Sequence, residues 1–167
     1  MSGVTIRAAR GDDRERLVKA FGGLDKASIY RRFFFPKKTL GEDELRRLTA
    51  GDGGRDMVRV ATVGSGREET IVGLGHCVRS GSGADTAFIV EEDYHGRGIA
   101  TELLRQLTDA ARRLGVTRLE ADVLADNTAM LKVFRRCELS RRETRSGAIV
   151  HVELFLDPGA AAGAAGC

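Results

Sequence analysis

The spacing of apolar residues along the chain changes several times, and each spacing predicts one kind of element. In several stretches apolar residues alternate with other residues or run together briefly, and turn segments such as GSGREE and SGSGAD separate some of them. This pattern is typical of strands joined by turns. The predicted strands cover Val4 to Ala9, Arg55 to Val63, Thr70 to Arg79, Thr86 to Glu92, Val116 to Leu124, and a pair within Leu139 to Leu156 that turns at Ser146-Gly147.

Other stretches have helical spacing. Between Gly98 and Gly115 the apolar residues fall on one helical face, which predicts a long amphipathic helix closed by a glycine. Shorter helices are predicted where a capping residue or a proline bounds an apolar pattern. The first begins at Asp12 or Asp13 and ends at Gly22-Gly23. The second covers Asp25 to Pro36, the third covers Thr39 to Thr49, and the last runs from Asp126 or Asn127 to Cys137.

The resulting order is β-α-α-α-β-β-β-α-β-α-β-β. It predicts the α/β class in its α+β form, a mixed sheet with helices on its faces, rather than a strictly alternating doubly wound fold. The length of 167 residues suits one domain, expected over residues 1–156. The Ala/Gly-rich tail, residues 157–167, is expected to be disordered.

Composition narrows the function classes. The net charge is only +3 and most arginines alternate with acids, which argues against a nucleic-acid partner. No long apolar run or secretory leader pattern is present, so we expect no membrane partner and a cytoplasmic location. The cysteines, Cys77, Cys137 and Cys167, lie far apart with no zinc-type spacing, so no metal site is predicted.

The segment EEDYHGRG, between a predicted strand and the long helix, is the strongest chemical signal. Gly96 and Gly98 let a ligand approach the backbone, the helix N-terminus attracts anions, and Arg97 adds positive charge. The segment therefore predicts a phosphate cradle. It is not a P-loop, because the chain has no G-x-x-x-x-G-K-[ST] sequence. It is not a dinucleotide fingerprint, because GRGIAT has no third glycine.

The stretch HGRGIA, His95 to Ala100, resembles the acetyl-CoA loop [QR]-x-x-G-x-[GA] of the Gcn5-related N-acetyltransferase (GNAT) superfamily, with His95 at the Gln or Arg position. DVLADNTAMLKVFRRCEL resembles the family's second signature. SIYRRFFFPKKTLGEDELRRLTAGD and ADTAFIVEEDYHGRG are similar to the GNAT domain of bacterial protein-lysine acetyltransferases that modify acyl-CoA synthetases. The resemblance covers about Thr5 to Leu156 and implies the GNAT fold, with a central, mostly antiparallel mixed sheet.

The resemblance also implies roles for particular residues. Asp85 stands where the protein-acetylating group has a glutamate base. The resemblance implies that Asp85 is the base and, being shorter, acts through a water or on a substrate that sits deeper; the alternative is a surface turn residue. Phe134 replaces a tyrosine that protonates the leaving thiolate in many relatives. Asn127 would contact pantetheine or cap its helix. The acetyl-CoA-binding set implied by the resemblance is Ile89, Val90, His95, Gly96, Arg97, Gly98, Ile99, Ala100, Thr101, Asn127 and Phe134.

The donor implied is acetyl-CoA, and an amine would attack its thioester directly. The acceptor implied by the narrower resemblance is a protein lysine, with an acyl-CoA synthetase-like protein as partner. A small-molecule amine acceptor and a non-catalytic acyl-CoA sensor are the alternatives. A homodimer is expected at family level only. His76 and His151 are interpreted as packing residues of strands.

Overall fold

The computed structural model describes residues 3–23, 40–51 and 54–156, and the structural statements below refer to these residues. The predicted helix over Asp25 to Pro36 and the tail at 157–167 lie outside them. The elements are β1 (Val4–Ala8), α1 (Arg14–Gly22), α3 (Glu42–Leu48), β2 (Asp56–Val63), β3 (Thr70–Ser80), β4 (Gly83–Val90), α4 (Ile99–Arg113), β5 (Arg118–Leu124), α5 (Thr128–Arg136), β6 (Ser140–Ser146) and β7 (Ile149–Phe155).

The strands form one sheet of seven in the order β1-β2-β3-β4-β5-β7-β6. All neighbours are antiparallel except β4 and β5, which run parallel. The predicted mixed, mostly antiparallel sheet is therefore confirmed. Strand β4 begins at Gly83, three residues before its predicted start, because its first residues pair with both neighbouring strands.

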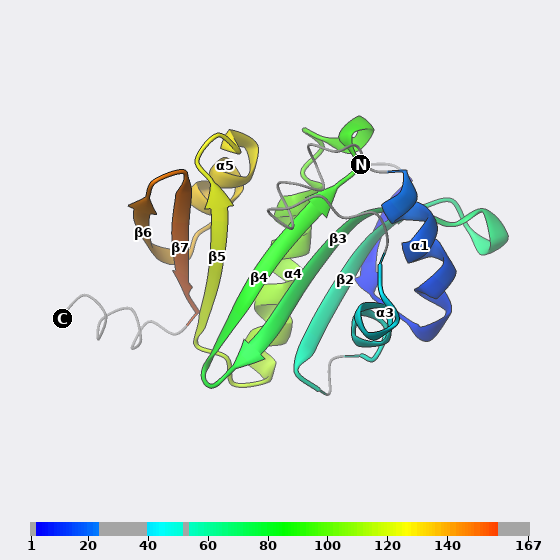
Figure 1. Ribbon diagram of the computed structural model, residues 1–167, viewed down its shortest axis with the longest axis horizontal. Helices are drawn as coiled ribbons and strands as arrows, with labels where there is room; N and C mark the ends of the chain where they lie inside the picture. The colour runs from blue at the N-terminus through cyan, green and yellow to red at the C-terminus, as the bar shows by residue number, and fades with distance from the viewer. Residues whose placement is uncertain (1–2, 24–39, 52–53, 157–167) are drawn as a thin grey trace.

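Helices cover both faces of the sheet. In the view of Figure 1, α4 lies behind the strands and α3 lies in front of β2. Helix α4 shares a buried cluster with α5, β5 and β7, whereas α1 and α3 pack on the opposite face of β2 and β3. Helix α4 approaches β3 closely at Gly75, where a Cβ atom would lie 2.8 Å from Leu107 Cδ1. Within the described ranges, no helix is both long and apolar enough to cross a membrane.

Strands β4 and β5 separate along their length. They pair only from Gly83 opposite Arg118 to Asp85 opposite Glu120, and beyond Asp85 the two strands diverge (Figure 1). The ring of Phe88 meets the ring of Phe134 from α5 edge to face, with centroids 6.0 Å apart. Aromatic side chains thus pack next to the gap, and among the described strands the second half of β4 has no partner on its β5 side.

A buried carboxylate fixes the start of α1. Asp13 is fully buried, and its two oxygens accept hydrogen bonds from the Arg7 guanidinium at 2.8 Å each. The Arg10 amide donates to the same carboxylate at 2.7 Å. Asp13 is the residue before α1, as predicted, but its side chain makes no capping bond to that helix. It joins β1 to the turn before α1 instead.

Burial alone would raise the pKa of the Asp13 carboxyl, but the hydrogen bonds from Arg7 and Arg10 outweigh burial and lower the pKa to about 2. Because the folded pKa lies below the ordinary value, this ionised carboxylate stabilises the fold above about pH 4. The stabilisation is lost as the pH falls from about 4 towards 2.

We therefore expect Asp13→Asn to lower the free energy of unfolding by about 3 kcal/mol at pH 7, since it removes the buried charge partner of the Arg7 guanidinium and leaves that guanidinium only its pair with Glu69. Urea denaturation at a series of pH values measures this difference, which should shrink below about pH 4. The control is Asp12→Asn, because Asp12 is exposed and pairs with an exposed Arg10. A loss that stays constant between pH 7 and pH 3 would contradict this explanation.

Candidate active site

A cavity of about 350 Å³ opens where β4 and β5 diverge, on the sheet face that carries α4 and α5. We call it the α4–α5 cavity. The end of β4, the following loop, the first turn of α4 and one side of α5 form its walls. Its lining residues are Phe88, Ile89, Val90, Tyr94, His95, Gly96, Gly98, Ile99, Ala100, Thr101, Asn127, Ala129, Met130, Lys132, Val133 and Arg136.

The glycine-rich segment forms the loop between β4 and α4. Gly96 and Gly98 have φ of 75° and 79°, a left-handed conformation that glycine adopts without steric cost. Gly98 is the N-cap of α4, and no side chain caps the helix there. The first-turn amides of α4 are therefore not used by a capping side chain, and a helix N-terminus of this kind favours anions. The loop is suited to phosphate, as its sequence predicts.

Two side chains hold this loop in place. His95 Nε2 lies 2.7 Å from the carbonyl oxygen of Val90, so the ring, as donor, closes the loop back onto the end of β4. The Arg97 guanidinium lies over the Tyr94 ring, 4.9 Å from its centroid, and Arg97 does not line the cavity.

Asn127 caps its helix, as predicted, and its contact with pantetheine stays a prediction. It is the N-cap of α5, and its Oδ1 accepts a hydrogen bond from the Met130 amide at 3.3 Å. It also lines the α4–α5 cavity. Because the cap fixes the side chain, Asn127 presents a preoriented polar group to a ligand.

The structure brings together most of the acetyl-CoA set expected from the sequence, but Arg97 and Phe134 are not among the lining residues. Phe134 is 1% exposed and packs in the core against Phe88. The cavity adds Lys132 and Arg136, which sequence reasoning missed. Because Lys132 and Arg136 are four residues apart on a predicted helix, the sequence does indicate that both side chains lie on the same face of that helix. Only the tertiary structure shows that they face the glycine loop.

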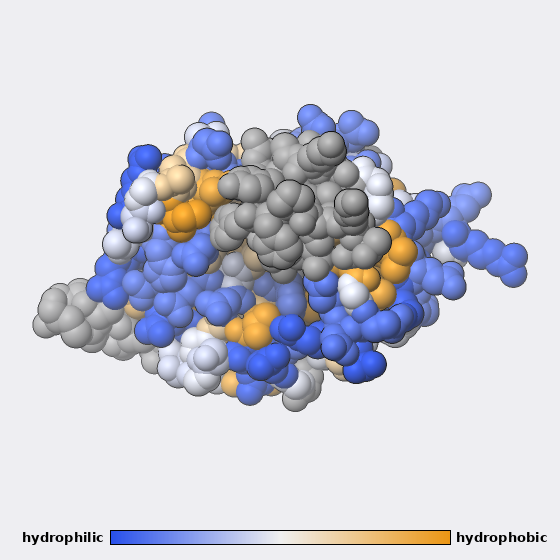
Figure 2. Space-filling view, in the orientation of Figure 1, coloured by the Kyte–Doolittle hydropathy of each residue, from blue (hydrophilic) through white to orange (hydrophobic). Residues whose placement is uncertain are grey.

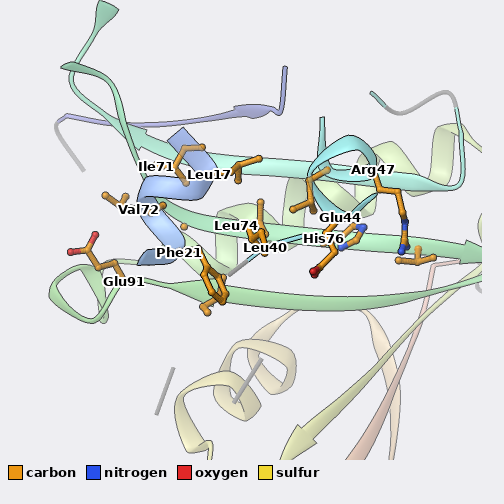
Figure 3. A pocket seen from close by; sticks show the side chains of 15 residues that line it. Leu17, Phe21, Leu40, Glu44, Arg47, Ile71, Val72, Leu74, His76 and Glu91 are labelled. Carbon is orange, nitrogen blue, oxygen red and sulfur yellow. The ribbon is translucent and has the colours of Figure 1, made fainter. Parts of the chain in front are cut away.

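A second cavity, of about 290 Å³, lies on the other face of the sheet, and we call it the α1–α3 cavity. Its walls are mostly apolar, and Figure 3 shows Glu91 at one end, with Glu44, Arg47 and His76 at the other. Ile89 lines both cavities. The two cavities therefore meet at one residue of β4, from opposite faces of the sheet.

A charge cluster lies at one end of the α1–α3 cavity, where Arg47 and His76 line the wall and buried Asp56 bonds to both. Asp56 accepts hydrogen bonds from Arg47 at 3.0 and 3.2 Å, and His76 Nε2 lies 2.7 Å from Asp56 Oδ1. Burial by itself would raise the pKa of Asp56, but the bonds from Arg47 and His76 lower it below its usual value. Asp56 is thus ionised at neutral pH and fixes the orientation of the His76 ring.

Asp85 is exposed and lines neither cavity. It is the last residue of β4 that pairs with β5, so it lies at the point where the two strands part. Asp85 and Ile89 are four residues apart and so share a face of β4. The strand rise puts their Cα atoms about 13 Å apart.

Hydrophilic residues predominate on the face over β5, β7 and β6, while smaller apolar patches lie near α5 and the end of β5, over the lower part of β3 and β4, and beside α1 (Figure 2). His151 on β7 is bonded on this open face to Asp122 at 2.7 Å and to Glu120 at 3.1 Å. These two carboxylates raise the pKa of His151, and the hydrogen bond that the ring makes to Asp122 has the largest effect. Among the described residues, no group of His, Cys, Asp and Glu side chains could hold a metal ion.

Comparison with known proteins agrees with this geometry. Residues 27–138 match the family model described as "Acetyltransferase (GNAT) family". The chain belongs to the GNAT acetyltransferase family and is an N-acetyltransferase that uses acetyl-CoA.

Two curated relatives are acetyltransferases. The chain is 33% identical over 134 residues to Acetyltransferase Pat of Mycolicibacterium smegmatis, a match of 78% of this chain and 39% of that protein. It is 32% identical over 130 residues to Acetyltransferase PA5475 of Pseudomonas aeruginosa, a match of 76% of this chain and 69% of that protein. The matched part is thus well under half of the length of Acetyltransferase Pat.

Solved structures share the fold. The GNAT domain of S. lividans PAT superimposes with a TM-score of 0.80 at 28% identity, over 91% of this chain and 90% of that one. The protein yncA from Salmonella typhimurium, solved with its cofactor acetyl-CoA, has a TM-score of 0.73 at 18% identity, over 94% and 96% of the two chains. The chain is thus close to the GNAT domains of protein acetyltransferases.

The loop geometry leads to a test at Gly98. We expect Gly98→Ala to weaken acetyl-CoA binding about tenfold, because a left-handed φ costs a residue with a Cβ about 1–2 kcal/mol and the loop would relax away from it. Isothermal titration calorimetry measures the Kd. Gly81→Ala is the matched control, since Gly81 also has a positive φ (61°) but lies in the β3–β4 turn. Equal affinities for the Gly98 variant and the parent protein would contradict the cradle.

The cationic side of α5 gives a second test. CoA carries a 3′-phosphate besides its pyrophosphate, and Lys132 and Arg136 supply positive charge to the wall opposite the glycine loop. We expect Lys132→Ala and Arg136→Ala each to weaken CoA binding about three- to tenfold, and dephospho-CoA binding less. Arg135→Ala is the control, because Arg135 pairs with Glu143 at 2.8 Å and does not line the cavity. Equal losses for CoA and dephospho-CoA would assign the two cations to the pyrophosphate instead.

Proposed function

We propose that the protein transfers an acetyl group from acetyl-CoA to the ε-amine of a lysine on another protein, with an acyl-CoA synthetase-like protein as the partner. The observation that carries the proposal is that two cavities on opposite faces of the sheet share Ile89 beside the gap between β4 and β5. A donor in the α4–α5 cavity and an acceptor in the α1–α3 cavity would meet there.

The backbone of β4 supports the donor position. Beyond Asp85 this strand has no partner on its β5 side, so its backbone groups there can pair with the amides of pantetheine. In the proposal Ile89 and Val90 make these bonds, and one of their amides polarises the thioester carbonyl. The amides from Gly96 to Ala100 hold the pyrophosphate, with Thr101 as a further donor.

The α1–α3 cavity supports a lysine as acceptor. A lysine side chain has an apolar stem and a cationic tip, and this cavity has apolar walls with carboxylates at Glu44 and Glu91. The similarity to Acetyltransferase Pat and to the GNAT domain of S. lividans PAT favours the same class of acetyltransferase. The cytoplasmic location and the homodimer stay predictions.

Asp85 is proposed as the base. The acceptor arrives as an ammonium, which must lose a proton before its nitrogen can attack the thioester carbon. Asp85 lies where the gap begins and on the same face of β4 as Ile89, but about 13 Å along the strand, so an intermediate group has to carry the proton to it. The C–S bond then breaks and CoA leaves as a thiolate, since Phe134 has no proton to give.

The test is acetylation of purified acyl-CoA synthetase and, in parallel, of a panel of small amines, followed by mass spectrometry. We expect the synthetase to be acetylated on lysine. Asp85→Asn should lower kcat about 100-fold or more and leave the Kd of acetyl-CoA unchanged. The matched control is Asp109→Asn, because Asp109 pairs with Arg105 on α4 and lines neither cavity.

Three results would overturn parts of the proposal. Acetylation of small amines alone would make the protein a small-molecule acetyltransferase. Micromolar binding of acetyl-CoA with no transfer to any acceptor would make it an acyl-CoA sensor. Full activity of Asp85→Asn would remove Asp85 from the mechanism.

A further inference from the structure

The ring of His95 lies on the ligand side of β4. The peptide between Val90 and Glu91 donates its N–H to the Val72 carbonyl of β3 at 2.8 Å. Because a trans peptide is planar, with its N–H and C=O on opposite sides, the Val90 carbonyl is directed away from β3, to the side on which β5 diverges. His95 Nε2 lies 2.7 Å from that carbonyl oxygen, and His95 lines the α4–α5 cavity. The ring therefore lies next to the gap, directly before the glycine loop.

The bond to Val90 fixes which nitrogen of a neutral His95 ring carries hydrogen. A carbonyl oxygen only accepts, so Nε2 is the donor and bears the hydrogen. Nδ1 then has a lone pair, and within the described residues it has no hydrogen-bond partner. A neutral ring can therefore accept a hydrogen bond at Nδ1, but it cannot donate one there.

An anion held by the glycine loop needs a donor from this ring. Phosphate oxygens accept hydrogen bonds, so a pyrophosphate gains nothing from the lone pair of a neutral Nδ1. An imidazolium donates from both nitrogens, so it can keep the bond to Val90 and make a charge-assisted bond to the anion. Gln or Arg, which the loop signature has at the position of His95, carries two or more N–H groups and needs no added proton. Histidine makes the second bond depend on a proton.

The wall of the α4–α5 cavity offers the ring no negative charge of its own. Among the described lining residues, the charged ones besides His95 are Lys132 and Arg136 of α5, and none is a carboxylate. A bound pyrophosphate would therefore supply the negative charge that favours a charged ring inside the cavity.

The other elements beside the ring do not change this balance. The first turn of α4 contributes Glu102, which is bonded to Arg105. Opposite the end of β4, the β3 residues Val72 and Gly73 are uncharged. The charged residues of the loop itself lie outside the lining of this cavity, and they are Glu91, Glu92, Asp93 and Arg97.

We infer that acetyl-CoA binding draws a proton onto Nδ1 of His95, so that the charged ring holds the pyrophosphate and the affinity for acetyl-CoA rises as the pH falls; this inference rests on the pyrophosphate position in the proposed function. Where the free ring is neutral and the bound ring is charged, one proton is taken up on binding and is released when CoA leaves. Because the two binding events are linked, affinity rises as the pH falls through the range in which histidine gains charge, from about pH 8 to pH 5.

Isothermal titration calorimetry with dephospho-CoA tests the inference. This ligand keeps the pyrophosphate and lacks the 3′-phosphate, whose own protonation near pH 6 would mix with that of the ring. The Kd at pH 5.5 should be about three- to tenfold lower than at pH 7.5. Titrations at pH 7 in buffers of different ionisation enthalpy should show uptake of about half a proton for each ligand bound. His95→Gln should show neither effect, because a glutamine amide gains no proton in this range.

His151→Gln is the matched control. His151 is held by Asp122 and Glu120 and lines neither cavity, so its replacement should leave the pH dependence and the proton uptake unchanged. Equal Kd values at the two pH values, or the same proton uptake in His95→Gln as in the parent protein, would overturn the inference while leaving the proposed function intact. Failure of both dephospho-CoA and acetyl-CoA to bind at millimolar concentration would overturn it together with the glycine cradle.

A second measurement, on the parent protein, decides the case if thermal melting shows that His95→Gln does not fold. NMR spectra of the histidine rings at pH 7 should show that His95 gains a hydrogen at Nδ1 when dephospho-CoA is added, while Nε2 carries one before and after. No rise in the charged fraction of this ring on binding, or an equal rise at His151, would overturn the inference.

Discussion

The loss of pairing between β4 and β5 after Asp85 is the constraint on which the active site depends. Two parallel strands that stayed paired would close the sheet and satisfy their backbone groups with each other. Because they part, one side of β4 is left for a ligand, and Ile89 lines a cavity on each face of the sheet. A donor and an acceptor can then approach one strand from opposite faces.

Aromatic packing sustains this separation. Phe88 from β4 and Phe134 from α5 meet edge to face beside the gap, within a core that also holds residues of β5 and β7. Phe134 stands where many relatives have tyrosine, and its fully apolar surroundings suit a ring without a hydroxyl. A phenylalanine at this position therefore fits the packing of α5, and Phe134 itself has no hydroxyl that could protonate a departing thiolate.

In the described part of the chain, the buried carboxylates of Asp13 and Asp56 are each bonded to an arginine, but their surroundings differ. Asp13 joins β1 to the start of α1 through Arg7 and lines neither cavity, so its charge contributes to stability alone. Asp56 joins α3 to β2 through Arg47 but also holds His76, whose ring faces a cavity. The Asp56–Arg47 pair therefore also orients a histidine ring that lines a cavity, whereas the Asp13–Arg7 pair only joins two elements of the fold.

The sequence alone determined the strands, the long helix α4, the glycine cradle and the α5 cap at Asn127, because these follow from local spacing, turn residues and capping. It could not show that Phe134 turns into the core while Lys132 and Arg136 face the cavity, since helix orientation depends on the packing of α5 against β5 and α4. It interpreted His76 as a packing residue and could not show that the ring is bonded to Asp56. Only the register of β3 against β4 sets His76 between Asp85 and Ile89, because contacts between strands join residues that are distant in the chain.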